Sequence, residues 1–168
     1  MNRDYSGTAA SNKDYAGNSN RSSKEDVQRM RKLFEKGNKH EHDVWETLWI
    51  ENVTPWDLGE PTKVLISELE RKKEDQRYWR SALIPGCGSG HDIVSLARYW
   101  DERPALPHTA TGAAHQPHQR TVVGLEISET SLDTAADNVK KSIEEQGSFQ
   151  QTNIQLYHGD FFCRSFYL

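Results

Sequence analysis

The sequence predicts an α/β fold in which parallel strands alternate with helices. Two short apolar segments, 82–85 and 122–125, and one segment of alternating apolar and polar residues, 153–158, have the length and pattern of strands. Two segments with apolar residues at helical spacing, 93–100 and 132–143, separate them. Because neighbouring parallel strands need a crossover connection, this order predicts a parallel sheet.

Composition places the chain among globular proteins with a single modest core. It has 168 residues, of which 35% are hydrophobic and 27% charged, and a net charge of −4. The net negative charge gives no overall positive potential to attract nucleic acid. The sequence has no run of 18 apolar residues, so no membrane span is predicted. Only two cysteines, Cys87 and Cys163, are present, which favours a reduced, cytoplasmic setting over a disulfide-stabilised secreted one.

The chain divides into a polar tail, 1–22, and one folded unit, 23–168. The tail is rich in Asn, Ser, Gly and Ala and cannot bury enough apolar surface to order itself. Helices are expected from Ser22 to Gly37, over 41–50, and from Pro61 onward. Residues 101–120 read as a long irregular loop.

A glycine loop joins the first strand to the following helix. Gly86, Gly88 and Gly90 stand where missing side chains let a ligand approach the backbone at a helix N-terminus. A tight turn without a ligand is the alternative. A dinucleotide fingerprint places its last glycine one residue further, but residue 91 is His. A nicotinamide-dependent oxidoreductase is therefore disfavoured, and a nucleoside cofactor without a pyrophosphate fits better.

Acidic residues follow the second and third strands. Glu126 is positioned to accept the hydroxyl groups of a ribose, or it is an ordinary acid before a helix. Asp160 and Phe161 have the chemistry to border an adenine ring, or they form a plain turn with a core phenylalanine. The distance from Gly86 to Glu126 exceeds the usual spacing of about 20 residues, which the loop at 101–120 explains.

Aromatic, histidine and cysteine residues offer further candidates. Trp45, Trp49 and Trp56 form a cluster that serves either as core or as an aromatic surface for a bound cation such as a sulfonium. Three histidines in the long loop have no metal-binding spacing and are expected to be solvated; they are His108, His115 and His118. Cys87 has no base nearby in the sequence and is expected to be a packing residue.

Four motifs in order resemble the thiopurine S-methyltransferase superfamily, and its halide/thiol methyltransferase branch most closely. They are Trp45-x-x-x-Trp49, TPWDLG at 54–59, LIPGCGSGHD at 83–92 and VGLEIS at 123–128. The similarity runs from about Trp45 to Phe162. Its specificity comes from the combination and order of the motifs.

This resemblance implies a class I methyltransferase fold, a Rossmann-like parallel sheet with helices on both faces, of which this chain holds the first three strands. It also implies S-adenosylmethionine as cofactor and small thiols or halide ions as methyl acceptors. By this resemblance, the loop with Gly86, Gly88 and Gly90 binds the methionine part of the cofactor, and Glu126 binds the ribose. Asp160 and Phe161 border the adenine. Trp45, Trp49 and Trp56 close the N-terminal side of the cofactor. The sulfonium is already activated, so no catalytic residue is assigned.

The sequence departs from the family pattern after Phe162, where it reads CRSFYL and ends. Family members continue into a fourth strand beside the first. The first strand is therefore expected at an open sheet edge, where we expect self-association. The alternative to a thiol or halide methyltransferase is a catalytically incomplete fragment that binds the cofactor or another partner.

Overall fold

The structure is a computed structural model that describes residues 24–35, 41–103 and 119–162. The predicted tail at 1–22, most of the predicted loop at 101–120 and residues 163–168 lie outside these ranges. The three loop histidines and Cys163 therefore also lie outside the described residues.

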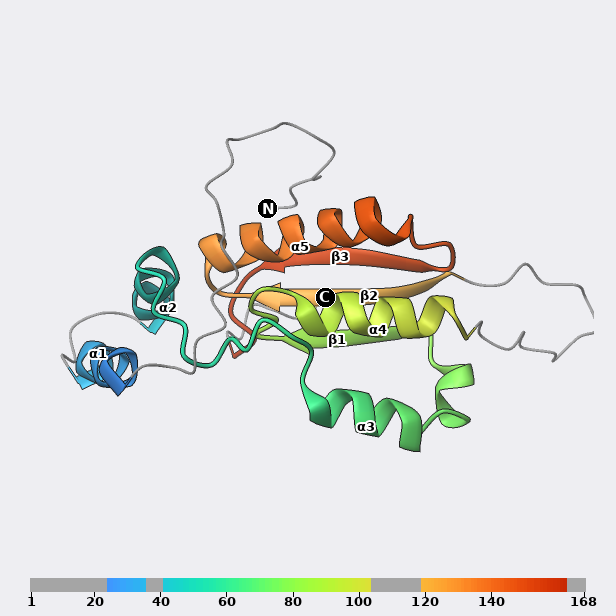
Figure 1. Cartoon of the computed structure of the whole chain (residues 1–168), viewed down its shortest axis with the longest axis horizontal. Helices are drawn as coiled ribbons and strands as arrows, with labels where there is room; N and C mark the ends of the chain where they lie inside the picture. The colour runs from blue at the N-terminus through green and yellow to red at the C-terminus, as the bar shows by residue number, and fades with distance from the viewer. Residues whose placement is uncertain (1–23, 36–40, 104–118, 163–168) are drawn as a thin grey trace, which may run out of the picture.

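Three parallel strands form the sheet (Figure 1). They are β1 (Ser81–Pro85), β2 (Arg120–Glu126) and β3 (Thr152–His158), in the order β1-β2-β3. In the register, Pro85 lies opposite Leu125 and Glu126 lies opposite His158. The predicted fold class, α/β with a parallel sheet, is confirmed, and the carboxyl ends of all three strands meet at one edge.

Five α-helices and one short 3-10 helix occupy the described residues. They are α1 (Lys24–Glu35), α2 (Glu41–Ile50), α3 (Lys63–Arg71), the 3-10 helix Asp75–Tyr78, α4 (His91–Asp101) and α5 (Glu129–Gln146). Ser128 caps α5 as predicted, and its side chain accepts a hydrogen bond from the Ser131 N–H. Helix α3 begins later than the predicted start at Pro61, because Thr62 is its N-cap.

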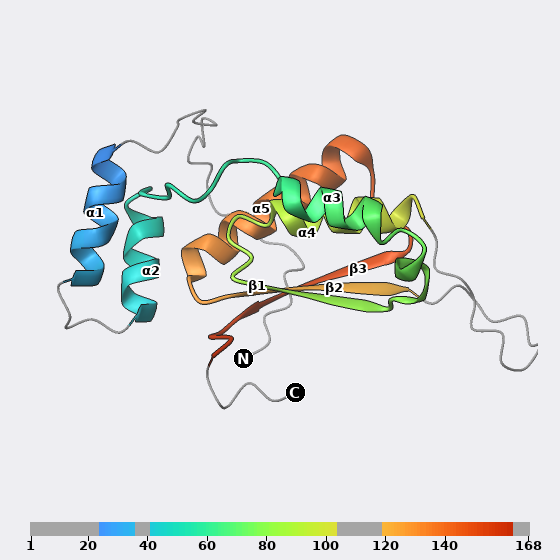
Figure 2. The same cartoon turned by 90° about the horizontal axis from the view of Figure 1, so that it is seen from below.

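The helices are layered on one face of the sheet. Viewed along the sheet, α3, α4 and α5 all lie above it (Figure 2), and α4 and α5 both contact β2 and β3. The described residues thus lack the second helical layer that the prediction includes. Ala82 and Ile84 of β1 pack toward the helices, so the intervening Leu83 points to the opposite face and is 48% exposed.

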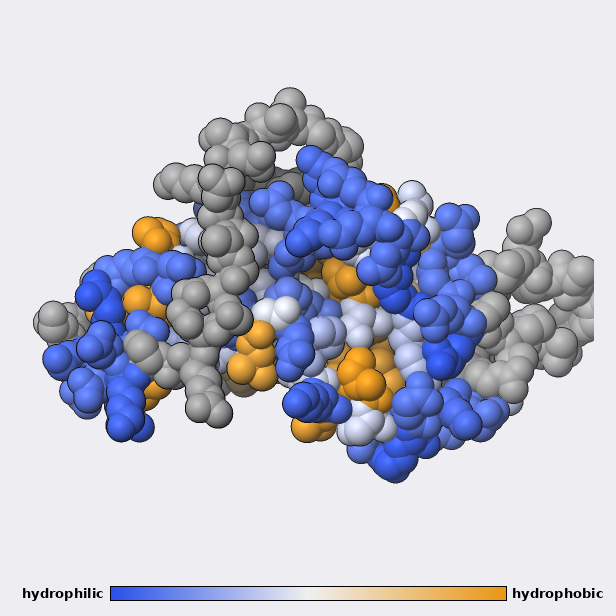
Figure 3. All heavy atoms as spheres, in the orientation of Figure 1, coloured by the Kyte–Doolittle hydropathy of each residue, from blue (hydrophilic) through white to orange (hydrophobic). Residues whose placement is uncertain are grey.

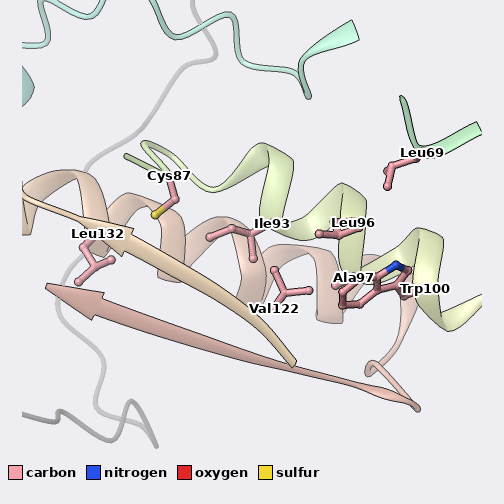
Figure 4. Packing of buried hydrophobic residues seen from close by; sticks show 8 residues of the cluster. All are labelled: Leu69, Cys87, Ile93, Leu96, Ala97, Trp100, Val122 and Leu132. Atoms are coloured by element: carbon pink, nitrogen blue, oxygen red, sulfur yellow. The ribbon is translucent and has the colours of Figure 1, made fainter. Parts of the chain in front are cut away.

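The core lies between α4 and the sheet (Figure 4). Ile93, Ala97 and Trp100 on the inner face of α4 are fully buried against Val122 of β2. Helix α2 belongs to a separate, smaller cluster, and it lies with α1 beyond the carboxyl edge of the sheet (Figure 1). The strands therefore end facing α2.

Helix α5 is tied to α4 near its own C-terminus. The Arg98 guanidinium of α4 donates hydrogen bonds to the carbonyl oxygens of Ser142 and Gly147, at 2.8 and 2.7 Å. The same group stacks over the Phe149 ring, 4.0 Å from its centroid. A cation is thus placed where the last carbonyl groups of a helix carry partial negative charge.

The face shown in Figure 3 is mainly hydrophilic, with separate hydrophobic patches. Among the described residues, Leu58 and Val64, near the start of α3, have side chains more than 70% exposed. No described helix has the length and apolar character needed to cross a membrane.

Candidate functional site

The glycine loop turns the chain from β1 into α4. Gly86, Gly88 and Gly90 all have positive φ angles, of 62°, 53° and 80°. Side chains larger than glycine disfavour this left-handed region. Gly90 is also the N-cap of α4, so the loop delivers backbone directly to a helix N-terminus.

The three glycines differ in what surrounds them. A Cβ added to Gly86 would meet no atom within 4 Å, and one added to Gly88 would lie 3.7 Å from Trp49 Cζ2. A Cβ added to Gly90 would lie 2.9 Å from the Cβ of Ala135, too close without movement. Gly86 and Gly88 therefore leave accessible backbone, whereas Gly90 allows the loop to pack against α5.

Glu126 connects the end of β2 to the glycine loop. Its Oε2 accepts a hydrogen bond from the Gly88 N–H at 2.9 Å. Its Oε1 accepts from the N–H groups of Ile127 and Ser128, at 2.8 and 3.1 Å. The structure thus brings together the two strongest candidates of the sequence, which lie 38 residues apart in the chain.

The hydrogen-bonding capacity of Glu126 fits a nucleoside cofactor. A carboxylate offers about four acceptor positions, and Glu126 uses three of them on backbone N–H groups. One position on Oε2 remains for a ribose hydroxyl, and displacing the Gly88 N–H would free a second. The open space at Gly86 allows a ligand to lie along the loop.

One part of the tryptophan cluster packs in a core, and another part lines a cavity. Trp56 contacts Trp45 and Trp49 edge to face, with ring centroids 5.1 and 6.2 Å apart. Trp45 also packs on Phe34 of α1, at 5.2 Å, and belongs to the small core around α2. Trp49 and Trp56, but not Trp45, line a cavity beside Gly88.

This cavity, of about 110 Å³, is bordered by the start of α4 and by the turn after α2. Three of its lining residues are acidic and one is a histidine; they are Asp57, Glu60, Asp92 and His91. Asp92 fixes the N-terminus of α3 by accepting hydrogen bonds from the Thr62 N–H and hydroxyl, at 2.7 and 3.2 Å. Carboxylates beside indole rings favour a positively charged ligand group.

Asp160 and Phe161 lie immediately beyond β3, on the same edge as Glu126. The Gly159 N–H donates to the Glu126 carbonyl oxygen at 2.8 Å, which holds this turn against the end of β2. Asp160 Oδ1 accepts from the Phe162 N–H at 2.8 Å, and the Phe161 ring is 48% exposed. Asp160 and Phe161 are the residues that the sequence suggests border an adenine, and this role stays a prediction.

Cys87 is a packing residue. Its side chain lies beneath the glycine loop, at one end of the core that also contains Ile93 and Val122 (Figure 4). Burial, together with the negative charge of Glu126, raises the pKa of the Cys87 thiol to about 12. The thiol therefore stays protonated at neutral pH and is a poor nucleophile.

Two important residues of this region were missed from the sequence. Gly124 of β2 has no room for a side chain, since an added Cβ would lie 2.3 Å from Ile93 Cδ1 and 2.9 Å from Leu156 Cδ2. Its place in the middle of a strand was the available signal. Glu46 of α2 binds the start of α5, through contacts 82 and 84 residues apart in the chain, and no local pattern indicates this. Within the described ranges, no group of three or more side chains is arranged to hold a metal ion.

Comparison with known proteins finds similarity to methyltransferases. Residues 40–102 match the family model of thiopurine S-methyltransferase. Thiocyanate methyltransferase 1 of Brassica oleracea is 32% identical over 102 residues, which is 61% of this chain and 35% of that protein. The probable thiol methyltransferase 2 of Arabidopsis thaliana is 35% identical over 89 residues, 53% of this chain and 30% of that protein. The chain thus spans about a third of the length of these curated relatives.

A solved structure described as "Conversion of a Disulfide Bond into a Thioacetal Group during Echinomycin Biosynthesis" superposes with a TM-score of 0.46 at 20% identity. The superposed residues make up 72% of this chain and 40% of the chain in the solved structure. The residues matched by the family model include the tryptophan turn and the glycine loop described above. Over these residues the chain is similar to the thiopurine S-methyltransferase family.

Proposed function

We propose that this chain binds S-adenosylmethionine and takes part in methyl transfer to a small thiol. The observation that carries the proposal is the junction of Glu126 with the glycine loop, faced by Trp49. The relatives named as thiol and thiocyanate methyltransferases support the same reaction class. Halide ions, which are soft anions like thiolates, are proposed as alternative acceptors.

In this proposal, each group of residues binds one part of the cofactor. Glu126 accepts the ribose hydroxyls, Gly86 and Gly88 admit the methionine part, and Asp160 with Phe161 borders the adenine. Bound S-adenosylmethionine supplies a methyl group already activated by the sulfonium. The residues of this chain bind and orient it and exclude water, and no proton transfer by a side chain is required.

The acidic cavity suits the positive end of the cofactor. Asp57, Glu60 and Asp92 line it together with Trp49 and Trp56. An ammonium or sulfonium group would be stabilised there, whereas a thiolate or halide ion would be repelled. We therefore propose that the methyl acceptor approaches from another side of the cofactor.

Titration of the full chain with S-adenosylhomocysteine in a calorimeter tests the cofactor part of the proposal. We expect saturable binding at one site. Incubation with methyl-labelled S-adenosylmethionine and hydrosulfide, thiocyanate or iodide then tests the transfer. Labelled product supports the methyltransferase, binding without product supports the cofactor-binding alternative, and absence of binding contradicts both.

We also propose that a second copy of the chain pairs along the outer edge of β1. That strand is hydrogen-bonded to β2 on one side, and no other described strand borders it. Exposed strand edges are templates for further pairing, and the exposed Leu83 adds apolar surface. Sedimentation at rising protein concentration should show dimers, and Leu83→Lys should shift the population to monomer. A concentration-independent monomer would contradict this pairing.

The proposed setting is the cytoplasm, supported by the free, protonated thiol of Cys87 and by the scarcity of cysteine. The net charge of −4 gives no support for a nucleic acid partner, and none is proposed. We assign residues 23–168 to one cofactor-binding unit.

A further inference from the structure

Helix α2 carries Trp49 to the glycine loop but makes few contacts with the sheet. Its buried residues Val44 and Leu48 form a cluster separate from the core between α4 and the sheet. Within the described structure, α2 packs against α1 and against α5. The position of Trp49 over Gly88 therefore depends on how α2 is held against α5.

Glu46 makes the polar connection between these two helices. Its Oε2 accepts hydrogen bonds from the Ser128 hydroxyl at 2.6 Å and from the Thr130 N–H at 3.3 Å. Its Oε1 accepts from the Thr130 hydroxyl at 2.5 Å. One carboxylate thus receives three hydrogen bonds from the first residues of α5.

The electrostatic environment favours the ionised form of Glu46. The N-terminus of α5 carries partial positive charge and N–H groups without partners inside the helix. Burial alone would raise the pKa of Glu46, but the hydrogen bonds from Ser128 and Thr130 outweigh it and lower the pKa from its ordinary value. The contact is therefore charged at neutral pH.

The same hydrogen bonds continue to the proposed ribose site. Ser128 donates its hydroxyl to Glu46 and its N–H to Glu126 Oε1. Glu126 Oε2 in turn accepts from the Gly88 N–H. Glu46 and Trp49 lie three residues apart on α2, on neighbouring positions of one helix face. The helix is thus linked to the loop twice, by this polar path and by the indole of Trp49 on Gly88.

We propose that Glu46 is a positioning residue, which fixes α2 and its Trp49 over the glycine loop without touching the cofactor. This inference rests on the proposed cofactor site. It implies that cofactor affinity depends on a carboxylate bound to α5 rather than to the ligand. Removing the carboxylate should leave the sheet intact but allow α2 to move away from the loop.

The test is calorimetric titration of the full chain with S-adenosylhomocysteine in Glu46→Gln. The Gln side chain has only one carbonyl oxygen, which cannot accept all three hydrogen bonds from Ser128 and Thr130. We therefore expect the Kd for S-adenosylhomocysteine to rise about tenfold. Glu51→Gln is the matched control, because Glu51 is a carboxylate next to α2 that pairs with Arg29 of α1, at 2.8 Å. We expect its Kd to be unchanged.

Variants of the partner residue separate positioning from a general loss of stability. Thr130→Val removes the hydroxyl donor and should raise Kd, whereas Thr130→Ser keeps it and should restore the affinity. Adding Glu46→Gln to Thr130→Val should raise Kd less than the product of the two single effects, because both act on one contact. Equal Kd values in wild type and Glu46→Gln would overturn the inference.

Hydrogen exchange provides a readout that does not need the ligand. Glu46→Gln should accelerate amide exchange in α2 more than Glu51→Gln does, with little change in β1 to β3. If the wild-type chain fails to bind S-adenosylhomocysteine, the proposed function fails, and unchanged exchange in α2 would then reject the role of Glu46 separately.

Discussion

Glu126→Ala should raise the Kd for S-adenosylhomocysteine at least about 100-fold. Hydrogen bonds to a charged group contribute roughly 1.5–3 kcal/mol each, and two to a ribose would account for that factor. The substitution also removes the acceptor of the Gly88, Ile127 and Ser128 N–H groups. Calorimetry at matched protein concentrations, with the fold checked by circular dichroism, measures the effect.

Two controls isolate the carboxylate. Glu126→Gln keeps the size of the side chain and one acceptor oxygen, so it should fold like the wild type and lose part of the affinity. Glu129→Gln removes an exposed carboxylate at the start of the same helix and should leave Kd unchanged. An unaltered Kd in Glu126→Ala would show that this residue does not bind the ribose.

Gly90→Ala should have the largest effect on stability among changes in the loop. The left-handed φ of 80° costs a residue with a side chain about 1–2 kcal/mol. The new Cβ would also lie 2.9 Å from Ala135 Cβ, and relieving such overpacking costs about 1–3 kcal/mol. We expect a loss of about 2–5 kcal/mol in the free energy of unfolding, measured by urea denaturation.

Gly86→Ala is the control for this substitution. It shares the positive φ, at 62°, but its added Cβ meets no atom within 4 Å. Its loss of stability should be confined to the backbone cost of about 1–2 kcal/mol. Its cofactor affinity should nevertheless fall, because the methyl group occupies the proposed ligand space. Equal losses of stability in both variants would argue against close packing of Gly90 on α5.

The sequence predicted features that depend on local physics. Left-handed turns need glycine, so the loop from Gly86 to Gly90 could be found without knowing its neighbours. Hydrophobic periodicity located α2 at residues 41–50 and the three strands. Glu126 followed from its place at the end of a strand, because parallel strands align their carboxyl ends.

Features that depend on packing between distant segments were not predicted. The contact of Glu46 with α5 and the bond of Asp92 with Thr62 join residues 82 and 30 positions apart, and their partners are set by helix placement. The crowding around Gly124 depends on side chains from α4 and β3. Trp45 packs on α1 instead of lining the cavity, because its direction on α2 differs from that of Trp49.

Helix α5 has a counterion from another helix at each of its ends. The Glu46 carboxylate of α2 meets its N-terminus, and the Arg98 guanidinium of α4 meets its C-terminus. With 18 residues, the helix separates these charges by about 27 Å. The macrodipole of α5 is therefore compensated at its two ends by residues of two different helices, Glu46 of α2 and Arg98 of α4. Through these charged contacts, α5 connects α2, which carries Trp45 and Trp49, to α4, which begins at the glycine loop.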